Sequence, residues 1–343
     1  MIDKVKEMAP SIFDAIKKSK SILLHCHPYP DPDSIGSVLA MSSVLKKMGK
    51  EVTPITGDSK YPDNLASLPN RDWIISRQWS QIDSKQFDLF IILDSSSPSQ
   101  ISQLTEVIFP KNMKTIVIDH HRTNAGFGNI NLIETDCSST CQILYVLFNY
   151  WGIKIDPDVA ICLLLGIYAD TGGFKYQNSN SETLKVVSEL AKIYPNYHKF
   201  VFDLDNYRQP VELEMMGVAL SSIEKYFDGR VIFSVITNKD IRKRGLRREE
   251  AMEGLIAGTL RSVVGWDLVA SLVEAEPNVV TVSLRTRDEN NFDVSKIAMA
   301  IGEKGGGHRG AAGTTISLPI AEAKRMLIDK IGELFPSLRP IVA

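Results

Sequence analysis

The segment SILLHCHPYPDPDSIGSVLAMSSVLKKMG, residues 21–49, decides the fold class of this chain. It starts with a short apolar run, continues through a loop that holds three prolines, and ends in a stretch with the apolar spacing of a helix. A buried strand, a polar turn and a helix in this order form the opening unit of an α/β domain. We therefore expect the first half of the chain to alternate strands with helices.

Further strand segments follow this unit: EVTPITG, FDLFIILD and KTIVIDH, at residues 51–57, 87–94 and 114–120. Helices are expected from about residues 139 and 156. The apolar runs 89–93 and 115–118 are too continuous for half-exposed strands, so they indicate buried strands of a parallel sheet. We predict a doubly wound, mainly parallel α/β domain over residues 1–190, with helices on both faces of the sheet.

The expected helix ends carry recognisable residues. Ser139 and Gln142 have the spacing of a capping box, which satisfies free backbone N–H groups at the start of a helix. Pro157 suits the first turn of the next helix, because that position needs no N–H donor. This second helix runs to Asp170, where a pair of glycines ends it. A lone buried carboxylate is costly, so Asp170 is expected to have a partner.

The second half of the chain predicts a separate domain. Residues 181–225 carry helical patterning and no strand signal, and we interpret 191–225 as a helical linker. From Gly229 strands and helices restart, with a helix expected at about 249–258. We predict a smaller mixed α/β domain over residues 226–343 with its own core.

Composition excludes several classes of function. The chain has 343 residues, of which 44% are hydrophobic, and 39 basic residues face 41 acidic ones for a net charge of -2. Such a chain has no global positive field to hold long nucleic acid. Its start lacks the apolar core of a signal peptide, and no stretch reaches the ~18 consecutive apolar residues of a membrane span. We expect a soluble globular protein without a membrane partner.

The cysteines indicate a reducing compartment. They include no CxxC pair, and they are Cys26, Cys137, Cys141 and Cys162. Buried thiols in the cytoplasm are the preferred interpretation. Cys137 and Cys141 have helical spacing, so a zinc site is the alternative, but no second Cys or His pair lies nearby and core packing is favoured.

Polar side chains follow the predicted strands where these end. The loop after the first strand holds His27, Asp31 and Asp33, and later strands are followed by Asp94 and by the run Asp119, His120, His121. The carboxyl ends of parallel strands meet at one edge of a sheet, where ligands bind. Asp170 is the fourth contribution to this edge. We expect these side chains to share one crevice.

Charge counting favours a metal site there over a cleft of catalytic acids. The carboxylates expected in the crevice are Asp31, Asp33, Asp94 and Asp170. Without cations they would repel one another and raise one another's pKa values. Two divalent ions would balance the charge. Aspartate and histidine without cysteine suit manganese or magnesium better than structural zinc, and the imidazoles favour manganese.

These segments resemble the motifs of the DHH phosphoesterase family, with Asp119-His120-His121 as the eponymous motif. The run GGGHRGAAG, residues 305–313, resembles the signature of the associated DHHA1 domain. The motifs follow the family order over nearly the whole chain. Two-domain members of this size resemble the NrnA-type nanoRNases and pAp phosphatases of bacteria, and also the stand-alone cyclic-dinucleotide phosphodiesterases.

The resemblance implies a role for each site residue. His27 and Asp31 would hold one manganese ion, Asp33, His120 and Asp170 would hold a second, and Asp94 would bridge the two. His121 would contact the scissile phosphate, and Asp119 would orient its neighbours. Gln142 departs from the family pattern, in which a glutamate is expected, but it affects no ligand.

The second domain is expected to select the substrate. Gly305, Gly306 and Gly307 offer backbone N–H groups that can approach an anion, and His308 and Arg309 add donors. A plain tight turn is the alternative for this run. Arg285 is a further candidate for the same phosphate, with an ordinary exposed strand arginine as the alternative. Tyr29, Phe174 and Tyr176 neighbour the metal motifs, and packing is the favoured interpretation of these aromatics over base stacking.

The implied function is manganese-dependent hydrolysis of RNA of two to five nucleotides and removal of the 3′ phosphate of pAp, with two metal ions that activate a water. The main alternative is a phosphodiesterase for cyclic di-AMP or pApA. A pyrophosphatase, a RecJ-like nuclease and a nucleotide-binding sensor without turnover are less favoured. A homodimer is compatible with the sequence.

Overall fold

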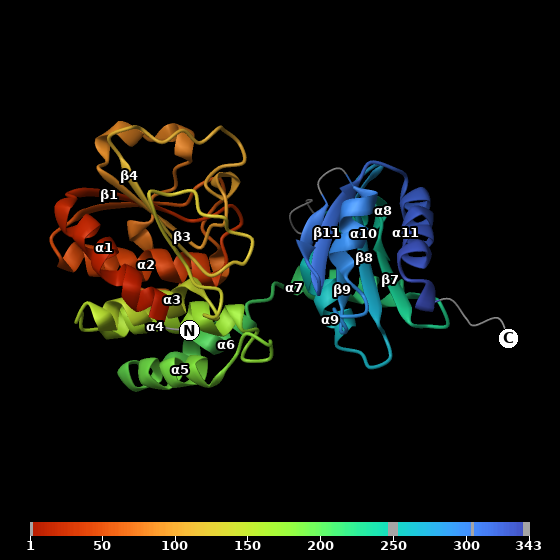
Figure 1. Ribbon diagram of the computed structural model, residues 1–343. Coiled ribbons are helices and arrows are strands. Elements are labelled where there is room, and N and C mark those ends of the chain that lie inside the picture. The colour runs from red at the N-terminus through yellow and green to blue at the C-terminus, as the bar shows by residue number, and fades with distance from the viewer. Residues whose placement is uncertain (1–2, 246–252, 303–304, 339–343) are drawn as a thin grey trace. The chain divides into compact units, whose positions relative to one another are not determined.

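The computed structural model describes residues 3–245, 253–302 and 305–338 (Figure 1). The chain divides into two compact units, Met1–Tyr207 and Arg208–Ala343. Each unit has its own buried core. In the described ranges no helix is long and apolar enough to cross a membrane.

The first unit is built on a parallel sheet in the order β2-β1-β3-β4-β5. Its strands are β1 (Ser21–His25), β2 (Glu51–Ile55), β3 (Leu89–Leu93), β4 (Lys114–Asp119) and β5 (Ile130–Ile133). The chain adds β2 on one side of β1 and then continues with β3 on the other side, so the strand order reverses between β1 and β3. Such a switch point leaves a crevice at the carboxyl ends of the strands, where ligands bind.

Long α-helices gather on one face of this sheet, and α2, α3 and α4 lie together there in Figure 1. The helices of this unit are α1 (Asp3–Lys18), α2 (Pro32–Lys47), α3 (Thr140–Tyr150), α4 (Pro157–Asp170), α5 (Ser181–Ile193) and α6 (Tyr197–Asp205). The opposite face carries a second cluster, in which Phe90 of β3 packs against Trp79 and Phe109. Short 3-10 helices lie in the connections between β2, β3 and β4: Asp63–Leu65, Arg71–Trp73, Trp79–Gln81, Ser84–Gln86 and Pro98–Gln100.

The prediction of a mainly parallel α/β unit is confirmed, with strands at the apolar runs. The expectation of helices on both faces was wrong for the described residues, because the buried apolar residues of α1–α5 all belong to the core cluster on one face. The edge strand β5 was not predicted, because its four residues INLI are interrupted by Asn131 and form no continuous apolar run, and only Leu132 is buried. All four cysteines are free and buried, which agrees with core packing.

The second unit is a mixed sheet in the order β10-β11-β9-β8-β7-β6. Only β7 and β8 pair in parallel among its described neighbours. Helices α10 and α11 cover one face, and α7 and α9 cover the other. Its elements are α7 (Pro210–Ser221), β6 (Glu224–Tyr226), β7 (Val231–Ile236), α8 (Asn238–Lys243), α9 (Glu253–Arg261), β8 (Leu268–Glu276), β9 (Val279–Thr286), α10 (Val294–Ile301), β10 (Gly306–His308), β11 (Ala311–Ile316), α11 (Ile320–Leu334) and the 3-10 helix Pro336–Leu338.

Three details differ from the expectations for this half. The helix expected at about 249–258 corresponds to α9, and residues 249–252 lie outside the described residues. Strand β6 was missed, because it has three residues and none of them is apolar except Tyr226. The stretch 191–225 contains α6 of the first unit and α7 of the second, and its role as a linker stays a prediction.

Candidate metal centre

The loop after β1 orients its histidine and aspartate through backbone contacts. Asp31 is the N-cap of α2, and its Oδ1 accepts hydrogen bonds from the N–H groups of Asp33 at 3.0 Å and Ser34 at 2.9 Å. The ring Nδ1 of His27 lies 2.9 Å from the carbonyl oxygen of Pro28. A carbonyl can only accept, so Nδ1 carries a proton, and Nε2 is the ring atom that a metal ion would bind in place of a proton. That Nε2 lies 3.7 Å from Asp31 Oδ1 and 3.4 Å from Asp94 Oδ2.

Asp94 directly follows β3 at the switch point. Its backbone has a φ of +52°, an uncommon conformation for a residue with a side chain. Only 1% of Asp94 is exposed, and its Oδ1 accepts a hydrogen bond from the Thr140 hydroxyl at 3.2 Å. Local strain of this kind concentrates at functional sites, where the surrounding structure holds it in place.

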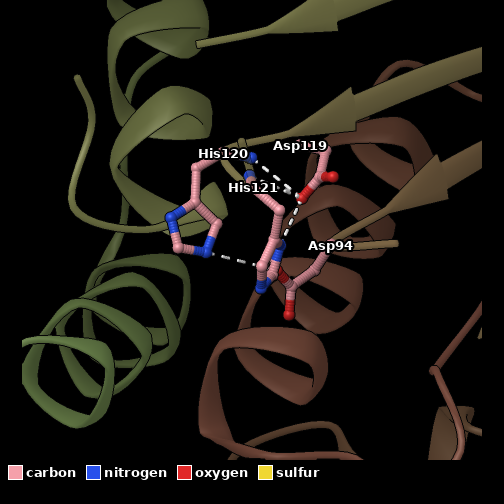
Figure 2. A group of neighbouring side chains, drawn as sticks. All are labelled: Asp94, Asp119, His120 and His121. Atoms are coloured by element: carbon pink, nitrogen blue, oxygen red, sulfur yellow. Dashed lines mark hydrogen bonds and ion pairs between the residues drawn. The ribbon is translucent and has the colours of Figure 1, made fainter. Parts of the chain in front are cut away.

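The three residues after the core of β4 form a hydrogen-bonded unit (Figure 2). Asp119 is fully buried, and its Oδ1 accepts from the backbone N–H of His120 at 2.8 Å and lies 2.8 Å from Nδ1 of His121. Its Oδ2 accepts from the amide of Asn124 at 2.7 Å, and the same amide donates to the Ser95 carbonyl at 3.1 Å. Asn124 therefore ties this unit to the loop that holds Asp94.

Helix ends supply the remaining carboxylates. Asp33 lies in the first turn of α2, and its two oxygens accept from the first N–H groups of α3, at Thr140 (2.7 Å) and Cys141 (2.9 Å). A helix N-terminus stabilises a negative charge in this way. Asp170 is the last residue of α4, and its Oδ2 lies 3.0 Å from His120 Nε2. A Cβ on Gly166 would lie 2.7 Å from Asp33 Oδ1, so a glycine is required for this close packing.

The structure brings together all the residues that the sequence placed at this site. Their ligand atoms form three groups, each within 4.8 Å: His27, Asp31 and Asp94; Asp33, His120 and Asp170; and Asp94, Asp119, His120 and His121. The first two groups are the two ligand sets implied by the family resemblance, and Asp94 Oδ1 lies 3.6 Å from His120 Nε2 of the second set. The binding of metal by these residues stays a prediction.

The crowding of carboxylates shows in their protonation. Burial raises the pKa of Asp33 well above its usual range, and the Asp94 and Asp170 carboxylates add to the rise. Burial and Asp94 raise the pKa of Asp170 in the same way. Burial lowers the pKa of His27, but Asp31 and Asp94 outweigh it and raise this pKa to about 11. The centre therefore takes up protons where it could instead take up cations.

These donors fit divalent metal ions. His120 Nε2 is buried and makes no hydrogen bond within the described part of the chain, although it faces the Asp170 and Asp94 carboxylates. A cation between them would satisfy this nitrogen and relieve the carboxylate repulsion. Carboxylate and imidazole donors suit manganese or magnesium, and the described clusters of potential ligands contain no cysteine.

Two residues of the site were missed in the sequence, Thr140 and Asn124. Thr140 contacts both Asp33 and Asp94, and Asn124 contacts Asp119. Neither has a signal beyond its proximity to a motif. The capping box is also only half formed: Ser139 accepts from the Gln142 N–H, but the Gln142 side chain accepts from the N–H and hydroxyl of Ser138 instead of from Ser139.

The predicted substrate residues lie together at one end of the second unit. The glycine run is not an open loop, because Gly306–His308 form β10, which pairs with β11 in an antiparallel hairpin. Arg309 lies in the hairpin turn, with Nε 3.5 Å from Asp293, and Gly305 precedes β10. His308 is paired with Ala311, and Ala311 is paired with Arg285 of β9. Paired residues share a sheet face, so His308 and Arg285 flank a small alanine.

A parallel sheet with a polar centre at its switch point and a separate mixed-sheet unit define the class of this protein. Residues 21–167 match the DHH family, N-terminal domain, and residues 232–336 match the DHHA1 domain. The chain belongs to the DHH/DHHA1 family of phosphoesterases, as its motifs indicated.

Individual relatives agree with this assignment. The bifunctional oligoribonuclease and PAP phosphatase NrnA of Thermus thermophilus is 28% identical over 315 residues, which cover 91% of this chain and 89% of that protein. The cyclic-di-AMP phosphodiesterase GdpP of Bacillus subtilis is 26% identical over 356 residues, which cover 97% of this chain and 50% of GdpP. The crystal structure of an exopolyphosphatase-related protein from Bacteroides fragilis has the same fold, with a TM-score of 0.87 at 23% identity over 97% and 98% of the two chains. The protein is a hydrolase that acts on phosphoester bonds.

Proposed function

We propose that this protein is a manganese-dependent hydrolase of short RNA oligonucleotides that also removes the 3′ phosphate of pAp. The observation that carries the proposal is the pair of ligand groups on either side of Asp94, His27 with Asp31 and Asp33 with His120 and Asp170. The similarity to NrnA over 91% of this chain supports the choice of substrates.

The first unit would hold two metal ions with these side chains. When bound, the ions would supply Lewis acidity and lower the pKa of a water so that it can attack phosphorus. The chain contributes the orientation of its ligands: Pro28 fixes the His27 ring, and the N-terminus of α3 fixes Asp33. Preorganised ligands need no rearrangement when the substrate arrives.

His121 supplies a proton in this proposal. Burial lowers the pKa of His121, but the hydrogen bond to Asp119 and the charge of Asp94 outweigh burial and raise it. Asp119 Oδ1 accepts a hydrogen bond from the Nδ1–H group of His121 at 2.8 Å. The Nε2 proton of His121 is then the one that can be donated to a phosphoryl oxygen or to the leaving oxygen. Asp119 acts as a positioning residue, because it holds the tautomer and the ring direction of His121.

The second unit would bind a terminal phosphate of the substrate. His308 and Arg285 flank Ala311 on one face of the sheet, and Arg309 extends from the adjoining turn. Imidazole and guanidinium groups that flank one residue of a sheet face suit a terminal phosphate. The same anion could be approached by the backbone N–H groups of the glycine run Gly305, Gly306 and Gly307. Gly306 and Gly307 contribute less, because their strand β10 is paired with β11 on one side.

A substrate panel tests this function. The purified protein is loaded with Mn²⁺, Mg²⁺ or Ca²⁺ and given RNA of two, five and 24 nucleotides, pAp, pApA and cyclic di-AMP. We expect the highest kcat/KM on the shortest RNAs and on pAp with Mn²⁺, and little turnover of the 24-mer. Comparable turnover of all RNA lengths, or none with any metal, would contradict the proposal.

Cyclic-dinucleotide cleavage is the second candidate, because the similarity to GdpP extends over 97% of this chain. The same panel separates the two functions. Turnover of cyclic di-AMP above that of pApA and pAp would establish the second candidate in place of the first.

We also propose a location in the reducing cytoplasm, which the four free, buried thiols support.

We further propose that the chain forms a homodimer. Light scattering of the full chain would test this by giving a mass of one chain or of two.

A further inference from the structure

Tyr29 lies in the loop between His27 and Asp31 and has two unusual properties. Its side chain is exposed, with 83% of the residue accessible to solvent, so the packing that we expected for this ring from the sequence is wrong. Its backbone has a φ of +56°, a left-handed conformation that is costly for a bulky residue and natural for glycine. Isolated exposed aromatics are common. Here, however, the ring is too exposed for its burial to offset the strain of the backbone.

The loop is held in this conformation by its neighbours. The backbone N–H of Tyr29 donates to the Ser59 hydroxyl at 2.8 Å. Nearby, a Cβ on Gly57 would lie 2.6 Å from the Cys26 carbonyl oxygen, so the loops after β1 and β2 are in close contact. Asp58 accepts from the Gln103 N–H at 2.6 Å, which joins the segment after β3 to them. The strained position of Tyr29 is therefore part of a connected scaffold.

Tyr29 also lies close to the candidate metal centre. It is two residues from His27 and two from Asp31, whose Nε2 and Oδ1 atoms lie 3.7 Å apart. Two peptide units span at most about 7.6 Å between Cα atoms. The Cα atom of Tyr29 therefore lies within about 7.6 Å of the Cα atoms of both candidate ligands, close enough for its exposed side chain to extend to a nucleotide that is bound there.

We propose that Tyr29 forms a nucleobase-binding subsite, in which its ring stacks on the base of the nucleotide whose phosphate lies at the metal centre. This inference rests on the proposed function for the position of the phosphate. Stacking on an aromatic face accepts any base, because every base has a π-face. The subsite therefore gives affinity for nucleotides over other phosphoesters without selecting a sequence.

Binding of two ligands that differ only in the base tests the subsite. Titration calorimetry on the Mn²⁺-loaded full chain gives the Kd of AMP and of ribose 5-phosphate, with no need for turnover. We expect wild type to bind AMP roughly 5- to 150-fold more tightly than ribose 5-phosphate, as one base–aromatic stack allows. Tyr29→Ala should lose this preference and leave the Kd of ribose 5-phosphate within about 2-fold, and Tyr29→Phe should keep the preference.

Two further variants separate the ring from the backbone. Tyr29→Gly should lose the preference as Tyr29→Ala does, yet melt at a higher temperature, because glycine relieves the left-handed backbone. Tyr150→Ala is the matched control: Tyr150 is 50% exposed but ends α3, about 15 Å along the helix from Thr140, and its loss should change neither Kd.

Three results would overturn the subsite: no preference for AMP in wild type, a preference kept by Tyr29→Ala, or an equal loss of affinity for AMP and ribose 5-phosphate in that variant. A failed substrate panel would instead overturn the proposed function, since these binding constants do not depend on turnover.

Discussion

The two units of this protein hold their functional side chains in opposite ways. In the first unit Asp33, Asp94 and Asp119 are almost fully buried, and each accepts hydrogen bonds from neighbouring backbone or side chains. In the second unit His308 and Arg309 lie on an exposed hairpin. Buried charges are costly and need a rigid, complete set of partners, whereas exposed charges do not. The comparison suggests that the first unit performs the chemistry and the second sets affinity.

The largest effect is expected for Asp94, which belongs to the group with His27 and Asp31 and lies 3.6 Å from His120 of the other group. Asp94→Asn should lower kcat roughly 10³-fold or more, because in the proposed function it would weaken the binding of both metal ions. Metal content by mass spectrometry should fall, and circular dichroism should show an unchanged fold. Asp156→Asn is the control, since Asp156 caps α4 away from these groups and asparagine is an equally good cap. Full activity in Asp94→Asn would remove Asp94 from the centre.

A second-unit variant sharpens the contrast between chemistry and affinity. Arg285→Ala should raise the KM for pAp about 10- to 100-fold through the loss of a charged hydrogen bond. Its kcat and its metal content should stay near those of wild type. The exposed Arg325 on α11 provides the control, as Arg325→Ala should leave KM unchanged. A fall in kcat with constant KM for Arg285→Ala would contradict this division of roles.

A smaller effect is expected for Thr140, which contacts two carboxylates without being a ligand. Thr140→Val removes the hydroxyl that donates to Asp94 and should weaken Mn²⁺ binding roughly 10-fold in a calorimetric titration. Thr140→Ser keeps a hydroxyl at this position and should bind Mn²⁺ as tightly as wild type. Thr183→Val is a matched control, because the buried Thr183 hydroxyl contacts Gln142 and Asn180 instead of a ligand. Equal losses in both valine variants would show a packing effect and not a positioning role.

The smallest effect is the pH dependence of stability. In metal-free protein the raised pKa values of Asp33 and Asp170 keep protons in the folded state that the unfolded chain releases above about pH 4. The free energy of unfolding therefore falls as pH rises from there through the raised values. The pKa of His27 is raised to about 11, against 6.5 in the unfolded chain, so the free energy of unfolding also falls as pH rises above 6.5.

Thermal melts between pH 5 and pH 9 measure this dependence. The melting temperature should fall with rising pH in EDTA, and it should fall less with Mn²⁺, because the metal replaces the protons. A melting temperature in EDTA that rises over this range, or identical slopes in both buffers, would be inconsistent with a proton-loaded centre.

Much of the fold and of the centre was predictable from sequence for one physical reason. Continuous apolar runs identify buried parallel strands, and parallel strands place their carboxyl ends at one edge. Residues that follow such runs, such as Asp94 and His120, then meet although they are far apart in the chain. The edge strand β5 has no such run, and short 3-10 helices carry no periodic signal, so neither was predicted.

The supporting contacts were not predictable in the same way. The Thr140 N–H reaches Asp33 across 107 positions of sequence, and the bond depends on how α2 and α3 pack. The Gln142 side chain bonds to Ser138 instead of Ser139, although the capping-box spacing is present. In the second unit the glycine run pairs as a strand, because glycine permits a close hairpin as readily as an open loop.

Anomalous diffraction from crystals grown with Mn²⁺ tests the central claim most directly. Two manganese peaks are expected beside Asp94, one also contacting His27 and Asp31 and the other contacting Asp33, His120 and Asp170. A single peak, or peaks that do not share Asp94, would contradict a paired metal centre at this switch point.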